Sequence, residues 1–101
     1  MPEKLSTEFL VNKKPIELNP FVNDFLAQVT IGAVKSLKGV DYIRNIEVSR
    51  EYNDLAVNVN GEDIPITPFP NGIITSTIIG LASTLKGVDD VDSFNIKVAI
   101  G

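Results

Sequence analysis

The 101-residue chain contains no cysteine and no histidine. Their absence excludes disulfides, thiolate chemistry, zinc fingers, iron–sulfur clusters and acid–base catalysis by histidine. The chain also lacks the G-x-x-x-x-G-K-[ST] and G-x-G-x-x-G patterns of phosphate-binding loops. The segment after Met1 is mixed rather than apolar, so we expect no secretory signal and a cytoplasmic protein. No catalytic constellation stands out, and we expect a protein that is not an enzyme.

Basic residues are also scarce. Nine Lys and Arg against thirteen Asp and Glu give a net charge of −4. Residues 1–50 carry +1 and residues 51–101 carry −5, so the imbalance lies in the second half. An acidic chain without a basic stripe predicts no nucleic-acid partner. The asymmetry could steer one half towards the opposite half of another chain, but we favour ordinary solvated surface as its explanation.

What the chain does contain is an internal repeat with a spacing of 48 residues. The stretch 19–41 matches the stretch 67–89, and both have Pro-Phe at their second and third positions and end with Leu-Lys-Gly-Val-Asp. Apolar residues make up 44% of the chain, enough for a core, but a unit of this size would be marginal alone. We therefore expect one domain, 1–101, made of two repeats (about 5–50 and 53–98) that share a core.

Hydrophobic periodicity predicts the elements of each repeat. Alternating apolar residues predict strands over 5–11, 46–50, 55–59 and 94–100. Asn12-Lys13 and Asn60-Gly61 predict hairpin turns that lead into short return strands over 15–18 and 64–66, with Pro15 at a sheet edge.

Two helices follow these hairpins. Asn19-Pro20 and Thr67-Pro68 predict the N-caps of the two helices. Gly39 predicts that the first helix ends at Lys38, and by the repeat the second ends at Lys86. We expect Phe21 and Phe69 to fill the core beneath the hairpins. For the first helix, the predicted buried face consists of Val22, Phe25, Leu26, Val29, Ala33 and Leu37.

The element order ββαβ, twice over, predicts an α+β fold. Without the short hairpin arms it is the split βαβ, ferredoxin-like arrangement, an antiparallel sheet with two helices on one face. The sequence leaves the strand order open.

Both helices have unusually little charge. No charged residue occurs from Ile64 to Leu85, and none between Asp24 and Lys35. A transmembrane helix is excluded because three prolines and an Asn-Gly leave only about 14 residues of apolar helix, too few for a bilayer. A helix on the outside of a two-layer domain should carry charge on its solvent face.

These helices therefore predict self-association, as a homodimer packed through its helices, or binding to another protein. The alternative is a monomer whose helices and sheet bury one another fully. Glycine in the middle of both helices predicts a close helix crossing, within the chain or across a dimer, although each glycine could instead face a bulky residue such as Phe9. The interface candidates are Ile31, Gly32, Ile79, Gly80 and Ser83.

A binding protein for a small molecule or cofactor is the other hypothesis. Its pocket would lie between the helices and the sheet, and we expect Phe25, Val29, Ile73 and Thr77 to line it. No cofactor is predicted. The carboxylates Asp89, Asp90 and Asp92 lack the spacing of a calcium loop, so we predict a solvated loop and no metal site.

The pattern Val59-Asn60-Gly61, Ile64-Pro65-Ile66-Thr67-Pro68-Phe69, Gly80 and Leu85-Lys86-Gly87-Val88 resembles a repeat in C-terminal extensions of proteins similar to molybdopterin-guanine dinucleotide biosynthesis protein B. The resemblance covers roughly residues 54–98, and the first half of the chain is its twin. It implies an accessory module near molybdenum-cofactor maturation. The nucleotide-binding part of that family carries a phosphate-binding loop that this chain lacks, so no GTPase activity is implied.

Overall fold

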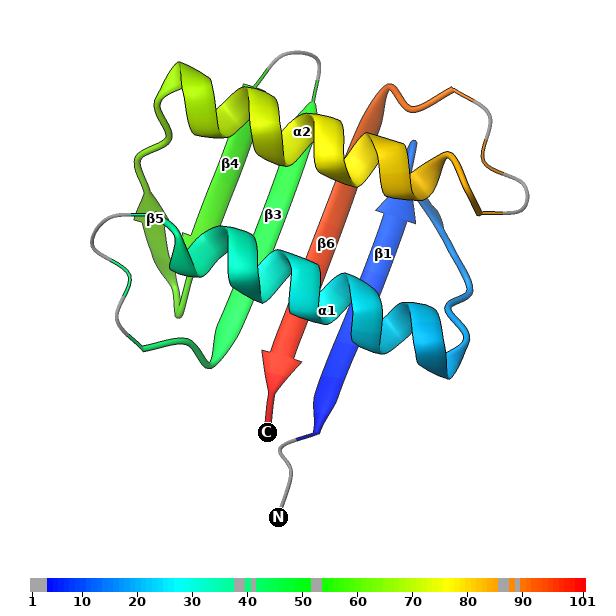
Figure 1. Ribbon diagram of the computed structural model, residues 1–101, viewed down its shortest axis with the longest axis horizontal. Coiled ribbons are helices and arrows are strands. Elements are labelled where there is room, and N and C mark those ends of the chain that lie inside the picture. Colours follow the sequence, from blue (N-terminus) through cyan, green and yellow to red (C-terminus); the bar gives the residue numbers. More distant parts are fainter. Residues whose placement is uncertain (1–3, 38–39, 41, 52–53, 86–87, 89) are drawn as a thin grey trace.

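The computed structural model describes residues 4–37, 40, 42–51, 54–85, 88 and 90–101. It is an α+β fold of two layers, in which two helices lie side by side over one face of a six-stranded antiparallel sheet (Figure 1). The elements run β1 (Leu5–Val11), β2 (Lys14–Pro15), α1 (Pro20–Lys35), β3 (Asn45–Glu51), β4 (Asp54–Val59), β5 (Glu62–Ile64), α2 (Pro68–Ala82) and β6 (Ser93–Ile100).

The strand order, which the sequence left open, is β2-β1-β6-β3-β4-β5. All neighbours pair antiparallel, so β1 and β3 are parallel to each other with β6 between them. In the same way β4 and β6 are parallel with β3 between them. The predicted split, ferredoxin-like arrangement is confirmed.

Elements that are 48 residues apart occupy matching places in the sheet. β4, β5 and β6 lie 48 residues after β1, β2 and β3. When each strand is replaced by its match, the strand order is the same order read from the opposite edge of the sheet. The two central strands therefore come one from each half of the chain. Descent of the halves from one duplicated unit remains a prediction.

The core lies between the helices and the sheet. Alternate strand residues fill it from below, including Phe9, Val48, Val57 and Ile96. On the helix side it takes, from α1 and α2 together, Leu26, Ala27, Thr30, Ile31, Val34, Ile74, Thr75, Ile78 and Ala82. Thr30 is tolerated there because its hydroxyl donates a hydrogen bond to the Leu26 carbonyl at 2.8 Å.

The buried face of α1 is turned by about one residue from the predicted one. Leu26 was predicted correctly, but Phe25 is exposed, and Ala27, Thr30 and Ile31 take its place. Phe21 and Phe69 are not core residues either, because they lie on the outer side of the first helical turns. Because apolar residues occur all round these helices, periodicity could not fix the face.

Both hairpin turns have the predicted backbone. Asn12 and Lys13 have φ of 52° and 68°, and Asn60 and Gly61 have φ of 54° and 90°, as a type I′ turn requires. Both return strands begin earlier than predicted, at Lys14 and Glu62, and β2 is also shorter than predicted. Both lie at sheet edges, as expected for Pro15.

Each turn asparagine also fastens the loop that enters a central strand of the other half. The Asn60 side chain accepts from the Arg44 and Asn45 N–H groups at 2.7 and 3.0 Å and donates to the Tyr42 carbonyl at 2.6 Å. Asn12 does the same, accepting from the Asp92 and Ser93 N–H groups at 2.7 and 3.0 Å and donating to the Asp90 carbonyl at 2.6 Å. We call these two sets of bonds the asparagine clamps.

The helix ends differ from the predictions in two ways. Asn19 caps α1 by accepting from the Val22 N–H at 2.8 Å, whereas Thr67 makes no side-chain cap bond. The residue of α2 that matches Val22 is Pro70, which has no N–H to donate.

Both helices also end earlier than predicted, at Lys35 and Ala82. The hydroxyls of Ser36 and Ser83 donate hydrogen bonds to the carbonyls of Gly32 and Ile79, so these carbonyls near the helix ends have a side-chain donor. The predicted ends at Lys38, Gly39 and Lys86 lie outside the described residues.

Candidate functional site

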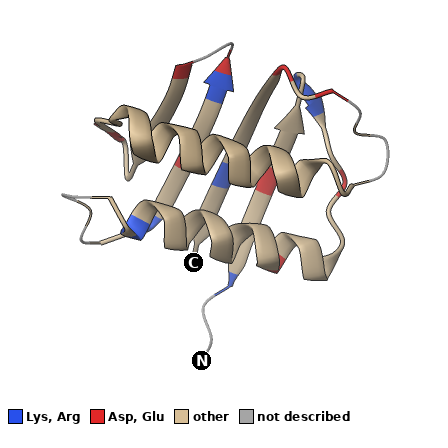
Figure 2. Cartoon of the chain, turned by 45° about the horizontal axis from the view of Figure 1, so that its top comes forward, with Lys and Arg blue, Asp and Glu red and all other residues tan. Residues whose placement is uncertain are grey.

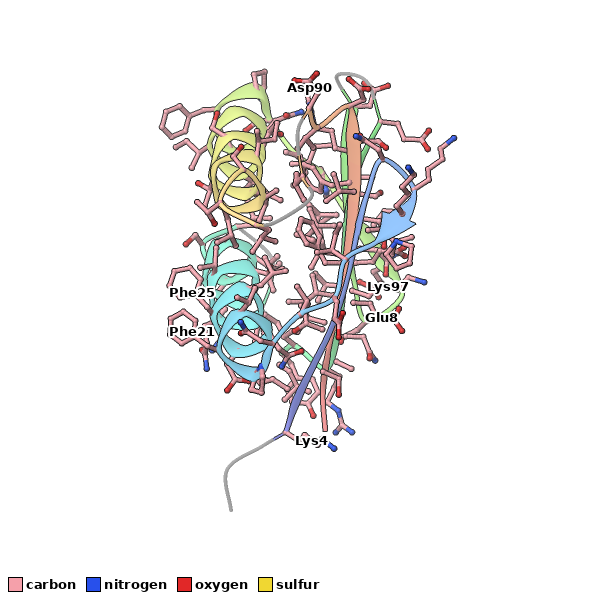
Figure 3. The ribbon with its side chains drawn as sticks, turned by 90° about the vertical axis from the view of Figure 1, so that its right-hand side faces the viewer. Lys4, Glu8, Phe21, Phe25, Asp90 and Lys97 are labelled. Atoms are coloured by element: carbon pink, nitrogen blue, oxygen red, sulfur yellow. The ribbon has the colours of Figure 1, made fainter. Side chains whose placement is uncertain are left out.

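The outer side of the helical layer carries an exposed apolar surface. Phe21, Phe25, Phe69 and Ile73 are 73%, 46%, 76% and 51% exposed. Figure 3 shows Phe21 and Phe25 pointing away from the sheet. We call the exposed outer residues of both helices the helical face: Phe21, Asp24, Phe25, Gln28, Gly32 and Lys35 from α1, and Phe69, Gly72, Ile73, Ser76, Thr77 and Gly80 from α2.

Local packing holds this surface in place without burying it. The rings of Phe21 and Phe25, one helical turn apart, stack with centroids 5.8 Å apart. On α2, a shallow hollow of about 490 Å³ is lined by Pro68, Phe69, Gly72, Ile73, Ser76 and Thr77. On α2, large apolar side chains therefore lie beside small residues.

The helical face is almost free of charge. Within α1 the charged residues are Asp24 and Lys35, and α2 has none. Figure 2 shows the same distribution, with charge gathered on the strands and loops. An outer helix normally keeps a polar, charged face in water. The alternative of helices and sheet burying one another fully is therefore wrong for these residues.

Gly32 and Gly80 lie exposed on the helical face. A Cβ built on either glycine meets no atom of the described chain within 4 Å. A crossing of α1 and α2 at these glycines is therefore wrong, and so is the alternative that they face Phe9. A crossing between two chains remains a prediction.

The other interface candidates divide between the two sides of the helices. Ile31 is buried against the sheet, so its placement on the outer side is wrong. Ile79 is half-buried and packs against the core. Ser83 is exposed just after α2, with its hydroxyl bonded to the Ile79 carbonyl at 2.8 Å.

The small-molecule pocket predicted between helices and sheet does not form around its four residues. Phe25, Ile73 and Thr77 are exposed on the helical face, and Val29 is half-buried.

The open face of the sheet has a different chemistry. Glu8 lies opposite Lys97, and Lys97 lies opposite Glu47 on the next strand. Glu47 also accepts a hydrogen bond from the Asn95 amide at 2.9 Å. Figure 3 shows Glu8 and Lys97 on the side away from Phe21 and Phe25. Alternating charges of this kind suit a solvated surface.

The described residues contain no group of three carboxylates that could hold a metal ion. Asp90 and Asp92 are exposed loop residues, and Asp89 lies outside the described part of the chain. Among the described helices, neither is long and apolar enough to cross a membrane.

Comparisons with protein families, curated proteins and solved structures gave no match to this chain. The evidence for function therefore comes from the surfaces of the molecule itself.

Proposed function

We propose that the protein is a small cytoplasmic binding module, not an enzyme, that associates with a second copy of itself through the helical face. The observation that carries this proposal is the exposure of Phe21 and Phe69, 73% and 76%, on a surface with almost no charge. Such apolar surface on a monomer marks an interaction site. Two sheets would then lie outside and four helices between them.

The charges of α1 favour a second copy over an unrelated protein. Asp24 and Lys35 are both exposed and 11 residues apart, about three helical turns, so they lie on one stripe of the helix. Consider a twofold axis that is perpendicular to α1, parallel to the helical layer, and passes between residues 29 and 30. It would place Asp24 of each copy opposite Lys35 of the other. A self-complementary surface of this kind is what a twofold dimer requires.

The same axis would stack α2 on α2, because the two helices run side by side (Figure 1). That contact would be free of charge and would centre between residues 77 and 78. Gly32 and Gly80 would let the paired backbones approach closely, which is a reason for exposed glycine in mid-helix, where it costs about 1 kcal/mol relative to alanine.

Sedimentation velocity at micromolar concentration tests the proposal. We expect the wild-type protein to sediment at about twice 11.0 kDa. Phe69→Asp should give a monomer, because a charge would be buried in the apolar contact. Ala99→Asp, which adds the same charge to the exposed face of the sheet, should leave the dimer intact. A wild-type mass near 11.0 kDa would contradict the proposal.

A charge swap tests the twofold arrangement separately. Asp24→Lys should weaken the dimer a few-fold at low salt, because it would face Lys35 of the other copy. Adding Lys35→Asp should restore it. If the double variant is as weak as the single one, the helices do not pair in this way.

A second candidate function is binding of a small apolar molecule, for which the hollow over α2 is the supporting observation. The sequence resemblance adds the proposal that the protein acts beside molybdenum-cofactor maturation. Native mass spectrometry of the purified protein tests both, since a bound molecule would add a defined mass. A spectrum of unmodified protein alone would oppose this candidate.

A further inference from the structure

Arg50 departs from the apolar pattern of its strand. It follows Ile46 and Val48 at period two, and its cross-strand neighbours are Leu55 and Phe94. The residue 48 positions later is Val98, which is 2% exposed in the core. A valine therefore fits the matching place in the other half, and the fold does not require arginine here.

One nitrogen of this arginine is also unsatisfied. Its Nε is buried, and no described residue accepts a hydrogen bond from it. A buried polar group without a partner is destabilising, and in a native protein it calls for an explanation.

A cavity of about 640 Å³ opens beside this side chain. It lies at one end of the sheet, and among the described residues Asn12, Lys13, Arg50, Glu51, Val91, Asp92 and Ser93 line it. This volume is in the range of small-molecule sites. One wall is fixed in advance, because the Asn12 clamp holds the backbone at Asp92 and Ser93.

We propose that this cavity binds a small organic molecule through a carboxylate group, with Arg50 as the principal contact and Lys13 as a second cation. A guanidinium presents parallel N–H donors that match the two oxygens of a carboxylate. Glu51 and Asp92 balance the two cations, so a single negative charge fits the site better than a dianion such as phosphate. The proposal is independent of the helical face, which lies elsewhere on the molecule.

The test follows the Arg50 Nε–Hε signal by NMR during titrations with acetate, glycine, succinate and inorganic phosphate, up to tens of millimolar. We expect a saturable shift with at least one of the three carboxylates, and weaker binding of phosphate. Arg50→Lys should weaken binding at least about tenfold, measured on the backbone amides of Asp92 and Ser93. Arg44→Gln removes an arginine that already contacts the Tyr42 hydroxyl, and it should leave binding unchanged.

Two results would overturn the proposal. One is the absence of any saturable shift with the carboxylates, and the other is phosphate binding more tightly than all of them.

A second variant tests the premise without a ligand. Arg50→Val copies the matching residue Val98, so we expect it to fold, to melt at a higher temperature and to lose the carboxylate response. A clearly lower melting temperature would show that arginine stabilises this place in the fold, and the case for a binding role would fail.

Discussion

The two halves of the chain share residues at some positions where the fold requires that residue, and at others where it does not. Asn12 and Asn60 make the same set of bonds at opposite ends of the sheet, so their agreement is explained by construction. Phe21 and Phe69, and Gly32 and Gly80, also agree, yet they lie exposed and outside the core. Because the packing within one chain does not explain these shared residues, we infer that they contact a partner on the helical face.

The places where the halves differ are equally informative. Arg50 stands where the second half has Val98, and Thr67 stands where the first half has Asn19. The first difference leaves a buried nitrogen without a partner, and the second leaves α2 without a side-chain cap. Substitutions at matched positions can test whether these comparisons hold.

The largest effect is expected at the asparagine clamps. Asn12→Ala and Asn60→Ala should each lower the free energy of unfolding by about 4 kcal/mol. Each variant loses three hydrogen bonds of about 1 kcal/mol net and forces alanine into positive φ. Urea denaturation at low protein concentration measures this.

The glycine variants separate the two causes. Asn12→Gly and Asn60→Gly keep the backbone conformation and should lose only the clamp, so they should be destabilised less than the alanine variants. If the losses of unfolding free energy at Asn12 and at Asn60 differ by much more than about 1 kcal/mol, the two clamps are not equivalent.

A smaller effect, confined to one half, is expected at the helix starts. Asn19→Ala should destabilise by about 1 kcal/mol because the Val22 N–H loses its acceptor. Thr67→Ala should change stability by no more than about 0.3 kcal/mol, since Thr67 makes no cap bond. Equal losses in the two variants would contradict this account of the caps.

An effect of the opposite sign is expected at the exposed glycines. Gly32→Ala and Gly80→Ala should each stabilise the monomer by about 0.5 to 1 kcal/mol, because the added methyl meets nothing within 4 Å and alanine favours helix. The same variants should weaken self-association. If they strengthen it or leave it unchanged, the glycines have no role in a close contact between chains.

The strands and turns were predictable because their signals are local. Alternation placed Phe9, Val48 and Ile96 in the core, and Asn60-Gly61 fixed a hairpin turn. The faces of the helices were not predictable in the same way. Helix α1 has apolar residues on both sides, and only contact with the sheet selects Ile31 over Phe25 for the core.

Interactions between distant residues were beyond the sequence for another reason. The Asn12 clamp joins residues about 80 positions apart, and a repeated asparagine in a turn is fully explained by its backbone conformation alone. The unsatisfied Nε of Arg50 likewise depends on the strand order, which brings Phe94 and Leu55 to either side of it.

An NMR dilution series tests most directly whether the helical face is where copies meet. Amide spectra recorded from millimolar to low micromolar concentration report which residues change surroundings as a dimer dissociates. We predict that the changes centre on Phe25, Gln28 and Gly32 in α1 and on Ile73, Thr77 and Gly80 in α2. Changes centred on Glu47, Asn95 and Lys97 of the open sheet, or spectra that do not depend on concentration, would contradict the account.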